Sequence, residues 1–220
     1  SRITGLSETG INAIYYDPTN EKLVVGYSNS NIDIIYRNDI INVPDLKRDN
    51  VTGDKNIYNI YSLGKDYYLS TGLGVVVIDG ERYEIKESWL IGAGGNQVKV
   101  NGLSNDGIFF YAATEEGLKK AAANVANLSD YNWQLVSGTN GLATGACQNV
   151  LTLQNKVIVQ QNDSVFIQDG TNWNLLYQDG WPIISVTASE NKISLCQRKA
   201  NGESKVTILN IDGIVANIFQ

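Results

Sequence analysis

Residues 68–75 read Tyr-Leu-Ser-Thr-Gly-Leu-Gly-Val, and residues 111–118 read Tyr-Ala-Ala-Thr-Glu-Glu-Gly-Leu. Both stretches contain a Tyr, two small or apolar residues, a Thr, two variable residues, a Gly and an apolar residue. The same frame recurs elsewhere, and we call the residues at the Thr position the anchor residues: Tyr27, Thr71, Thr114, Gln161 and Gln197. They lie 36 to 47 residues apart, so the chain is built from repeats.

Each repeat has the internal pattern of a small antiparallel sheet. An alternating segment such as 11–16 or 57–61 comes first, and it has the period of a half-buried strand. Turn residues follow it, rich in Asp, Asn and Gly. The next strand is the most apolar of its unit, at 23–25, 67–69, 108–111 and 157–159. A Gly or Ser then leads into a third strand, at 32–36, 75–79 and 165–167.

Repeats of about 40 to 50 residues that contain four short strands are typical of β-propeller blades. We therefore predict an all-β chain of about five four-stranded antiparallel blades that form a single domain. Their expected units are 8–50, 51–94, 95–140, 141–181 and 182–220. Five blades could close on themselves or form an arc of a larger, seven-bladed ring. Residues 3–7 resemble the tail of an earlier unit, which favours the arc.

Three local features complete the prediction. The alanine-rich stretch from Glu115 to Leu128 predicts a short helix inserted in the third blade. The glycine-rich segment 92–96 is expected to be a flexible loop between blades, because it lacks the rest of a phosphate-binding pattern. Tryptophans recur on what we expect to be outer strands, where they can cover the seam between blades, at Trp89, Trp133 and Trp173.

Composition limits the classes of function. The chain has 220 residues, of which 43% are hydrophobic and 18% charged, and a net charge of −6 gives no field that attracts nucleic acid. No apolar stretch approaches the ~18 residues of a membrane span. Because the chain begins at Ser1 and contains no methionine, we expect it to be a processed or cut piece of a longer protein.

The residues offer little for catalysis. There is no histidine, which removes the usual general base and the commonest zinc ligand. Glu115, Glu116 and Asp130 form the nearest approach to a carboxylate cluster, but neighbouring residues diverge on a strand or a helix, so we interpret them as solvated charges. We predict no enzyme activity and no cofactor.

Two further groups of residues contain side chains that could bind a metal ion or form a disulfide. The segment 17–21 carries oxygen ligands that could reach a calcium ion, but it lacks the EF-hand pattern, so a plain turn is favoured and no metal site is predicted. Cys147 and Cys196 are too few for a disulfide framework and too far apart in sequence for a zinc knuckle. We interpret both as buried free thiols.

One polar loop is better suited to binding than to reaction. Residues 27–31 read Tyr-Ser-Asn-Ser-Asn, and amides and a phenol can hydrogen-bond sugars or peptides without titrating. Loops gather at the rims of a propeller, where contacts are usually made. We therefore name Tyr27, Asn29 and Asn31 as candidate ligand or partner residues, with a simple hairpin turn as the alternative.

The order of several segments resembles a known family. Gly-Leu-Ser at residues 5–7, followed by an alternating strand and a small-residue strand, resembles the two-component-regulator propeller repeat. Residues 26–33, 43–46, 55–60 and 111–119, in that order, resemble PorZ-like N-terminal propellers of the type IX secretion system of Bacteroidota. The chain departs from the usual repeat by having Tyr27 and Gln161 in place of Thr, and Ser30 and Ser164 in place of Gly.

This resemblance implies a function. PorZ-like proteins are cell-surface components of an attachment complex that works with a sortase and with anionic lipopolysaccharide. The resemblance therefore implies an exported, outer-membrane-associated scaffold whose partners are a sortase-like protein and lipopolysaccharide. The negative net charge predicts no nucleic-acid partner. The alternative is the periplasmic sensor propeller of a hybrid two-component regulator that binds an oligosaccharide, because the same repeat builds such sensors. No functional residue of the family can be assigned to a numbered position here.

Overall fold

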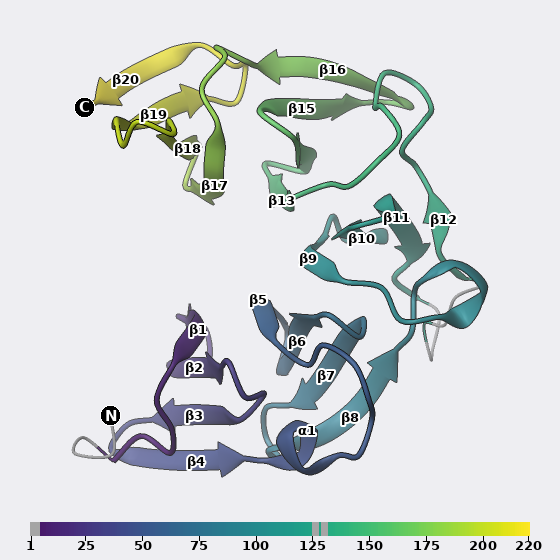
Figure 1. Cartoon of the computed structure of the whole chain (residues 1–220), viewed down its shortest axis with the longest axis vertical. Helices are drawn as coiled ribbons and strands as arrows, with labels where there is room; N and C mark the ends of the chain where they lie inside the picture. Colours follow the sequence, from purple (N-terminus) through teal and green to yellow (C-terminus); the bar gives the residue numbers. More distant parts are fainter. Residues whose placement is uncertain (1–4, 125–127, 129–131) are drawn as a thin grey trace. The chain divides into compact units, whose positions relative to one another are not determined.

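A computed structural model describes residues 5–124, 128 and 132–220. The chain is all-β, and its strands form five four-stranded antiparallel sheets, each a propeller blade with its strands in sequence order (Figure 1). The predicted fold class is therefore confirmed. The chain divides into two compact units, residues 1–103 with 125–133 and residues 104–124 with 134–220. The single-domain organisation and the blade number of the whole ring stay predictions.

The first unit contains two complete blades. The strands of the first are β1 (Ile11–Asp17), β2 (Lys22–Tyr27), β3 (Ile32–Tyr36) and β4 (Asp39–Val43). The strands of the second are β5 (Ile57–Leu63), β6 (Asp66–Thr71), β7 (Val75–Asp79) and β8 (Glu84–Trp89). The short helix α1 (Asp45–Arg48) lies between the two blades in sequence, and the 3-10 turn η2 (Ala93–Gly95) follows the second. Of the predicted tail at 3–7, residues 3 and 4 lie outside the described residues.

The remaining blades belong to the second unit, apart from the first residues of β9. The third blade has β9 (Val100–Asn105), β10 (Phe109–Thr114), β11 (Gly117–Ala122) and β12 (Gln134–Leu135). The fourth has β13 (Asn149–Leu153), β14 (Lys156–Gln161), β15 (Ser164–Asp169) and β16 (Asn172–Tyr177). The fifth has β17 (Ile183–Ser189), β18 (Lys192–Arg198), β19 (Ser204–Asn210) and β20 (Val215–Phe219).

The second strands form the centre of the core, as their apolar sequences predicted. Every residue of β6 is buried, and all but the first are buried in β14. In the first unit, Val24, Ile34 and Leu69 belong to one apolar cluster made by both blades. In the second unit, similar clusters join the third blade to the fourth and the fourth to the fifth. Burial on both faces explains why these strands are continuously apolar instead of alternating.

Two of the anchor residues are threonines that close the turn after the second strand. The Thr71 hydroxyl donates to the carbonyl oxygen of Gly74 at 2.9 Å, and the Thr114 hydroxyl donates to that of Gly117 at 2.7 Å. The two glycines have φ angles of +138° and +130°, a region that side chains rarely adopt. A Cβ on Gly74 would also lie 2.2 Å from the carbonyl oxygen of Trp89. The repeated Thr and Gly of the sequence therefore form one turn motif.

We expect Thr114→Val to lower the free energy of unfolding by about 1–2 kcal/mol, because the buried hydroxyl also accepts a hydrogen bond from the Glu116 N–H at 3.1 Å. Valine keeps the shape of the side chain but offers neither a donor nor an acceptor. The measurement is urea unfolding, and Thr187→Val, at an exposed position of β17, is the control. Equal losses in the two variants would contradict a structural role for this turn hydrogen bond.

The two glutamine anchors make a different connection. Each is buried at or next to the end of its second strand and binds the segment that leads into its own blade. The Gln161 amide donates to the Ala143 carbonyl oxygen at 2.8 Å and accepts from the Ala143 N–H at 3.1 Å. The Gln197 amide donates to Asp179 Oδ1 at 2.9 Å and accepts from the Thr207 hydroxyl at 2.8 Å. The longer glutamine side chain thus reaches from the second strand to the segment that enters the blade, a distance that a threonine side chain cannot span.

Asp179 accepts several hydrogen bonds in the connection that leads into the fifth blade. Its carboxylate accepts from the Tyr177 hydroxyl at 2.7 Å and from the Trp181 N–H at 3.1 Å, in addition to Gln197. It also forms an ion pair with Lys205, whose side chain is only 6% exposed. Burial opposes ionisation, but hydrogen bonds from Lys205, Tyr177 and the backbone outweigh it and hold the pKa of Asp179 at about 2. The carboxylate is therefore charged at neutral pH.

The predicted helix from Glu115 to Leu128 is wrong over its described part. Gly117–Ala122 forms β11, which pairs with β10 so that Ala113 lies opposite Leu118 and Tyr111 opposite Lys120. Residues 125–127 lie outside the described residues. Alanine favours helix only weakly, and the positive φ of Gly117 together with cross-strand pairing overrides that preference.

Other local predictions are partly corrected. Both cysteines are free, but only Cys147 is buried, because Cys196 points to the exposed face of β18 between two buried neighbours. Trp89 and Trp173 lie on fourth strands, whereas Trp133 precedes β12 instead of lying on a strand.

Two predicted loops are closed by hydrogen bonds. The 92–96 segment is a loop between blades, in which the Gly92 N–H donates to the Asn96 carbonyl oxygen at 3.0 Å. The segment 17–21 is a turn, in which the Asp17 carboxylate accepts from the Thr19 N–H at 2.9 Å and from the Asn20 side chain at 2.7 Å. These local bonds define the shape of each loop.

Candidate functional site

The predicted loop at 27–31 is the hairpin turn between β2 and β3. Tyr27 is fully buried and donates its hydroxyl hydrogen bond to Asp33 Oδ2 at 2.6 Å. Asn31 is 3% exposed, and its side-chain oxygen accepts from the Asn42 amide at 3.0 Å. Asn29 is exposed, although its side-chain oxygen also accepts from the Asn31 N–H at 3.1 Å. Of the three predicted binding residues, Asn29 alone presents its side chain to solvent, and ligand contact at this loop stays a prediction.

Asp33 explains why a tyrosine occupies the first anchor position. This buried carboxylate accepts from the Tyr27 hydroxyl, from the Ser7 N–H at 2.8 Å and from the Asn42 amide at 2.9 Å. Burial raises the pKa of Asp33, but the hydrogen bonds from Ser7, Tyr27 and Asn42 outweigh it and lower the pKa overall. The same environment, burial first and Asp33 second, raises the pKa of Tyr27. The pair holds the entering chain against the first blade.

Several loops lie together with this hairpin turn at one edge of the first unit, each in contact with the connection between the two blades. The Ser30 hydroxyl donates to the Lys55 carbonyl oxygen at 2.8 Å, and the Gln97 amide donates to the Thr52 carbonyl oxygen at 2.9 Å. A Cβ on Gly72 would lie 2.4 Å from the carbonyl oxygen of Asp54. We call this edge the loop edge; it comprises residues 28–31, 49–56, 72–74 and 90–97.

A polar cluster lies where the loop edge meets the first strands of the two blades. Its members are Asn12, Asp54, Asn56, Tyr58 and Lys99. Asp54 accepts from the Asn56 backbone N–H at 3.0 Å and side-chain amide at 2.7 Å, and from the Tyr58 hydroxyl. The Lys99 ammonium lies 4.3 Å from the centre of the Tyr58 ring. Asn12 donates to Asn56 at 3.5 Å, which links β1 to the second blade.

The electrostatics of the polar cluster suit recognition. Partial desolvation raises the pKa of the Asp54 carboxylate, but hydrogen bonds from Tyr58 and Asn56 and the charge of Lys99 outweigh it and lower the pKa overall. The cluster thus combines a carboxylate, two amides, a phenol and an ammonium, and Asn12 and Asp54 are exposed. Such groups hydrogen-bond hydroxyl-rich or peptide ligands, and an aromatic ring offers a face for stacking.

Sequence reasoning did not identify the polar cluster. Tyr58 belongs to the alternating segment 57–61, in which Ile57 and Ile60 are buried and Tyr58 is half-buried. A polar or aromatic residue on the solvent side of a first strand was the available signal. Asp54 and Lys99 had no such signal, because both lie in connections whose course depends on the packing of the blades.

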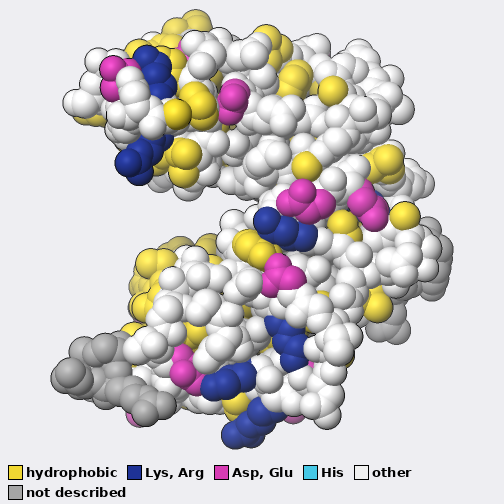
Figure 2. Space-filling view, in the orientation of Figure 1, with side chains coloured by type: hydrophobic (Ala, Val, Ile, Leu, Met, Phe, Trp, Pro, Cys, Tyr) yellow, Lys and Arg dark blue, Asp and Glu magenta, His cyan; other side chains and the backbone are white. Residues whose placement is uncertain are grey.

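Charge on the visible surface is mixed. Figure 2 shows basic side chains next to acidic ones on the face in view, without a large area of one sign. Among the described residues, no group of three or more His, Cys, Asp or Glu side chains is arranged to hold a metal ion. Within the same residues, no helix has the length and apolar character needed to cross a membrane.

The family model of the N-terminal β-propeller domain of PorZ, from the type IX secretion system, matches residues 1–134. The chain belongs to this family. The match includes both complete blades of the first unit, the loop edge and the polar cluster. The resemblance inferred from the sequence is therefore confirmed at the level of the family.

Two solved structures support the fold. One is PorZ, an essential bacterial surface component of the type IX secretion system of Porphyromonas gingivalis, with a TM-score of 0.82 and 19% identity over 100% of this chain. The other is the extracellular domain of a protein described as a hybrid two-component system of B. thetaiotaomicron, with a TM-score of 0.69 and 9% identity over 98% of this chain. In each case this chain spans 28% of the length of the other. No curated protein sequence matches the chain.

Proposed function

We propose that this chain is the non-catalytic binding module of an exported type IX secretion component, and that its loop edge docks a partner protein or envelope glycan. Family membership is the observation that carries the proposal. The partners that we propose are a sortase-like protein of the attachment complex and anionic lipopolysaccharide, and the proposed location is the outer surface of the cell. The polar cluster supports the proposal because its amide, phenol and carboxylate groups are arranged for hydrogen bonding without a titrating base.

We expect Tyr58→Ala to weaken binding of the docked partner or glycan about tenfold, because buried or half-buried aromatic side chains often dominate binding energy. The measurement uses the full-length protein, with the sortase-like component or purified anionic lipopolysaccharide immobilised. Tyr16→Ala is the control, since Tyr16 is 58% exposed on β1 and outside the polar cluster. Tyr58→Phe separates stacking from the hydrogen bond to Asp54.

Three results would contradict the proposal. Full-length protein that captures neither the sortase-like component nor lipopolysaccharide would remove the docking function. Turnover of a glycan that disappears when one Asp or Glu is replaced would make the protein an enzyme. Equal effects of Tyr58→Ala and Tyr16→Ala would show that docking does not use the polar cluster.

The alternative function is a periplasmic sensor that binds an oligosaccharide. The likeness to the extracellular domain of a two-component system favours it at the level of fold. A glycan screen distinguishes the two functions, because a sensor is expected to bind a short neutral oligosaccharide without a sortase-like partner. The gene sequence around this chain provides a second test, since a sensor requires a membrane helix and a histidine kinase.

A further inference from the structure

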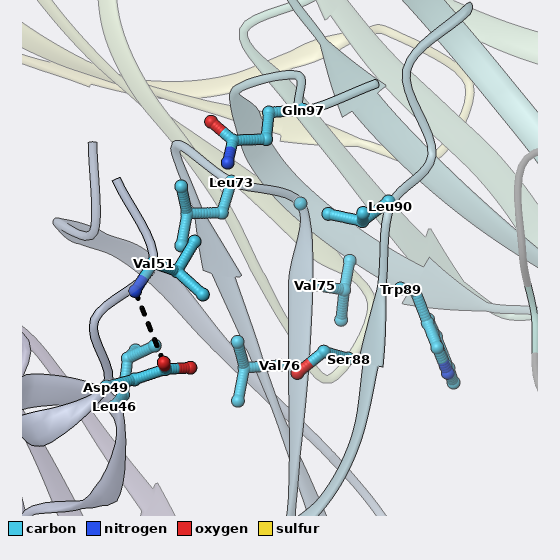
Figure 3. Close-up of a pocket in the computed structure, with 11 residues that line it drawn as sticks. Leu46, Asp49, Val51, Leu73, Val75, Val76, Ser88, Trp89, Leu90 and Gln97 are labelled. Atoms are coloured by element: carbon cyan, nitrogen blue, oxygen red, sulfur yellow. Dashed lines mark hydrogen bonds between the residues drawn. The ribbon is translucent and has the colours of Figure 1, made fainter. Parts of the chain in front are cut away.

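A small apolar pocket lies at the loop edge of the first unit (Figure 3). Its volume is about 250 Å³, and it opens between the connection after β4 and the strands β7 and β8. Apolar side chains form most of its wall, together with Asp49, Ser88 and Gln97. The apolar members are Leu46, Val51, Leu73, Val75, Val76, Trp89 and Leu90.

The walls of the pocket are held in place by contacts to backbone atoms. Lys55 donates to the carbonyl oxygen of Leu46 at 3.2 Å and to that of Asp49, which holds the connection in place. Gly74 at the pocket wall permits backbone contact with Trp89 that no other residue would allow. Gln97 joins the opposite side to the Thr52 carbonyl oxygen. These contacts come from the protein itself, so a ligand would enter a preformed site.

Two of the apolar side chains that line the pocket are exposed to water. Val51 is 41% exposed and Leu90 is 42% exposed. An apolar group that enters between these two side chains buries apolar surface of both the ligand and the pocket. The favourable free energy of this burial is about 25 cal/mol per Å². Ligand pockets for whole small molecules usually measure about 300–1,000 Å³, so this pocket lies just below that range and has room for one large side chain.

A negative charge at the pocket favours a ligand that carries a cation. Asp49 is the one charged residue among those that line it. Its Oδ1 accepts the Val51 N–H at 3.2 Å, which leaves Oδ2 able to accept from a cation (Figure 3). The pocket is also bordered by β8, the outermost strand of its sheet. The edge of a sheet is where an extended peptide can add as a further strand.

We propose that this pocket binds one large apolar side chain of an extended segment of a partner protein, and that an adjacent Lys or Arg of that segment pairs with Asp49. The proposal rests on the docking function proposed above and names the chemistry of the docked segment. Apolar walls anchor the side chain, the carboxylate selects a neighbouring cation, and β8 aligns the backbone.

The test uses dye-labelled nonapeptides of Gly and Ser with a central Leu-Lys or Phe-Lys pair, titrated with the chain by fluorescence polarisation. We expect these peptides to bind at least about fivefold more tightly than Leu-Glu and about tenfold more tightly than Ala-Lys versions. Leu90→Asp should weaken Leu-Lys binding about tenfold. Asp49→Lys should reverse the preference, so that Leu-Glu binds more tightly than Leu-Lys.

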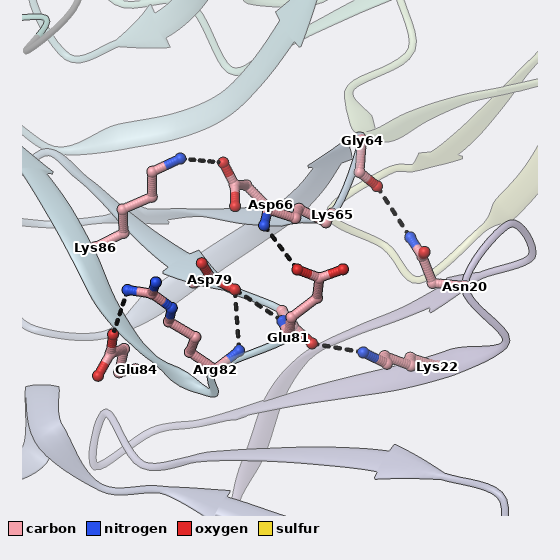
Figure 4. A network of polar contacts seen from close by, with 11 residues as sticks. Asn20, Lys22, Gly64, Lys65, Asp66, Asp79, Glu81, Arg82, Glu84 and Lys86 are labelled. Atoms are coloured by element: carbon pink, nitrogen blue, oxygen red, sulfur yellow. Dashed lines mark hydrogen bonds and ion pairs between the residues drawn. The ribbon is translucent and has the colours of Figure 1, made fainter.

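The opposite edge of the first unit provides the matched control. There, the turns after β5 and β7, with the adjoining parts of β6 and β8, carry a polar network in which Lys65 pairs with Glu81 at 2.7 Å and Lys86 with Asp66 at 2.7 Å (Figure 4). Leu63 precedes this network and is 41% exposed, like Val51 and Leu90. Leu63→Asp should leave peptide binding unchanged. Thermal unfolding of each variant verifies that the chain is folded.

The outcomes separate this proposal from the docking function. Equal affinity for all the peptides, or an equal loss in Leu63→Asp and Leu90→Asp, overturns the pocket proposal. Full-length Leu90→Asp that captures the sortase-like component as well as the unchanged protein also overturns it, while the docking function stands. Selective peptide binding in a protein that captures neither proposed partner supports the pocket and overturns the proposed partners.

Discussion

Replacing Asp179 with alanine is expected to lower the free energy of unfolding by about 3–5 kcal/mol, because the change leaves the buried Lys205 ammonium without its partner. The Tyr177 hydroxyl, the Trp181 N–H and the Gln197 amide lose an acceptor at the same time. Urea unfolding gives the size of the effect. Amide hydrogen exchange shows where the chain is destabilised. We expect the amides of β18 and β19 to lose the most protection from exchange.

Lys205→Met provides the matched test of this explanation. If an unpaired charge causes the loss, the double variant Asp179→Ala with Lys205→Met should be more stable than Asp179→Ala alone, because methionine fills similar space without a charge. Asp169→Ala, at an exposed position of β15, should change stability by less than about 0.5 kcal/mol. A loss in Asp179→Ala no larger than in Asp169→Ala would contradict the role of the ion pair.

The pH dependence of stability follows from the same carboxylate. The folded state holds the pKa of Asp179 at about 2, below its ordinary value of 3.8, so the unfolded chain binds the proton more readily. The stabilisation from Asp179 is therefore fully present above about pH 4 and is lost as the pH falls towards 2. Asp179→Ala should show a smaller loss of stability than the unchanged chain over that interval.

Asp33→Ala is expected to lower the free energy of unfolding by about 3 kcal/mol, because three donors in or near the first blade lose a buried acceptor. Tyr27→Phe removes one of these hydrogen bonds and leaves the carboxylate with two, so its expected loss is about 1–2 kcal/mol. Thermal and urea unfolding, followed by the fluorescence of the first unit's tryptophans, measure both. Asp39→Ala, at an exposed position of β4, is the control, and losses as large as in Asp33→Ala would contradict the explanation.

The regular part of the fold could be predicted because its signals are local. The third strand of the first blade was predicted at 32–36 and is Ile32–Tyr36, and that of the second was predicted at 75–79 and is Val75–Asp79. Alternation, turn residues and a repeated Gly with positive φ all specify the same hairpins. Where local signals disagreed, as at Gly117–Ala122, helix preference lost to pairing with β10.

The candidate site was less predictable because it depends on connections between blades. Tyr27 and Asn31 have the composition of a binding loop, yet Asp33 and Asn42 bind them internally. The acidic partner of Tyr27 lies six residues away on another strand, so no local pattern identifies the pair. Asp54 and Asp49 likewise acquire their roles only when the connection after β4 folds against the second blade.

The anchor residues also limit how blades can be exchanged or duplicated in such a protein. The anchor residues occupy equivalent positions in their repeats but hydrogen-bond to different partners. A threonine binds its own turn, and a glutamine binds the connection that enters its blade. The tyrosine binds an aspartate that holds the chain ahead of the first blade. A blade exchanged by cutting at strand ends would separate Gln161 from residues 143–145 and Gln197 from Asp179. Grafts and duplications should therefore carry each connection with the blade that follows it.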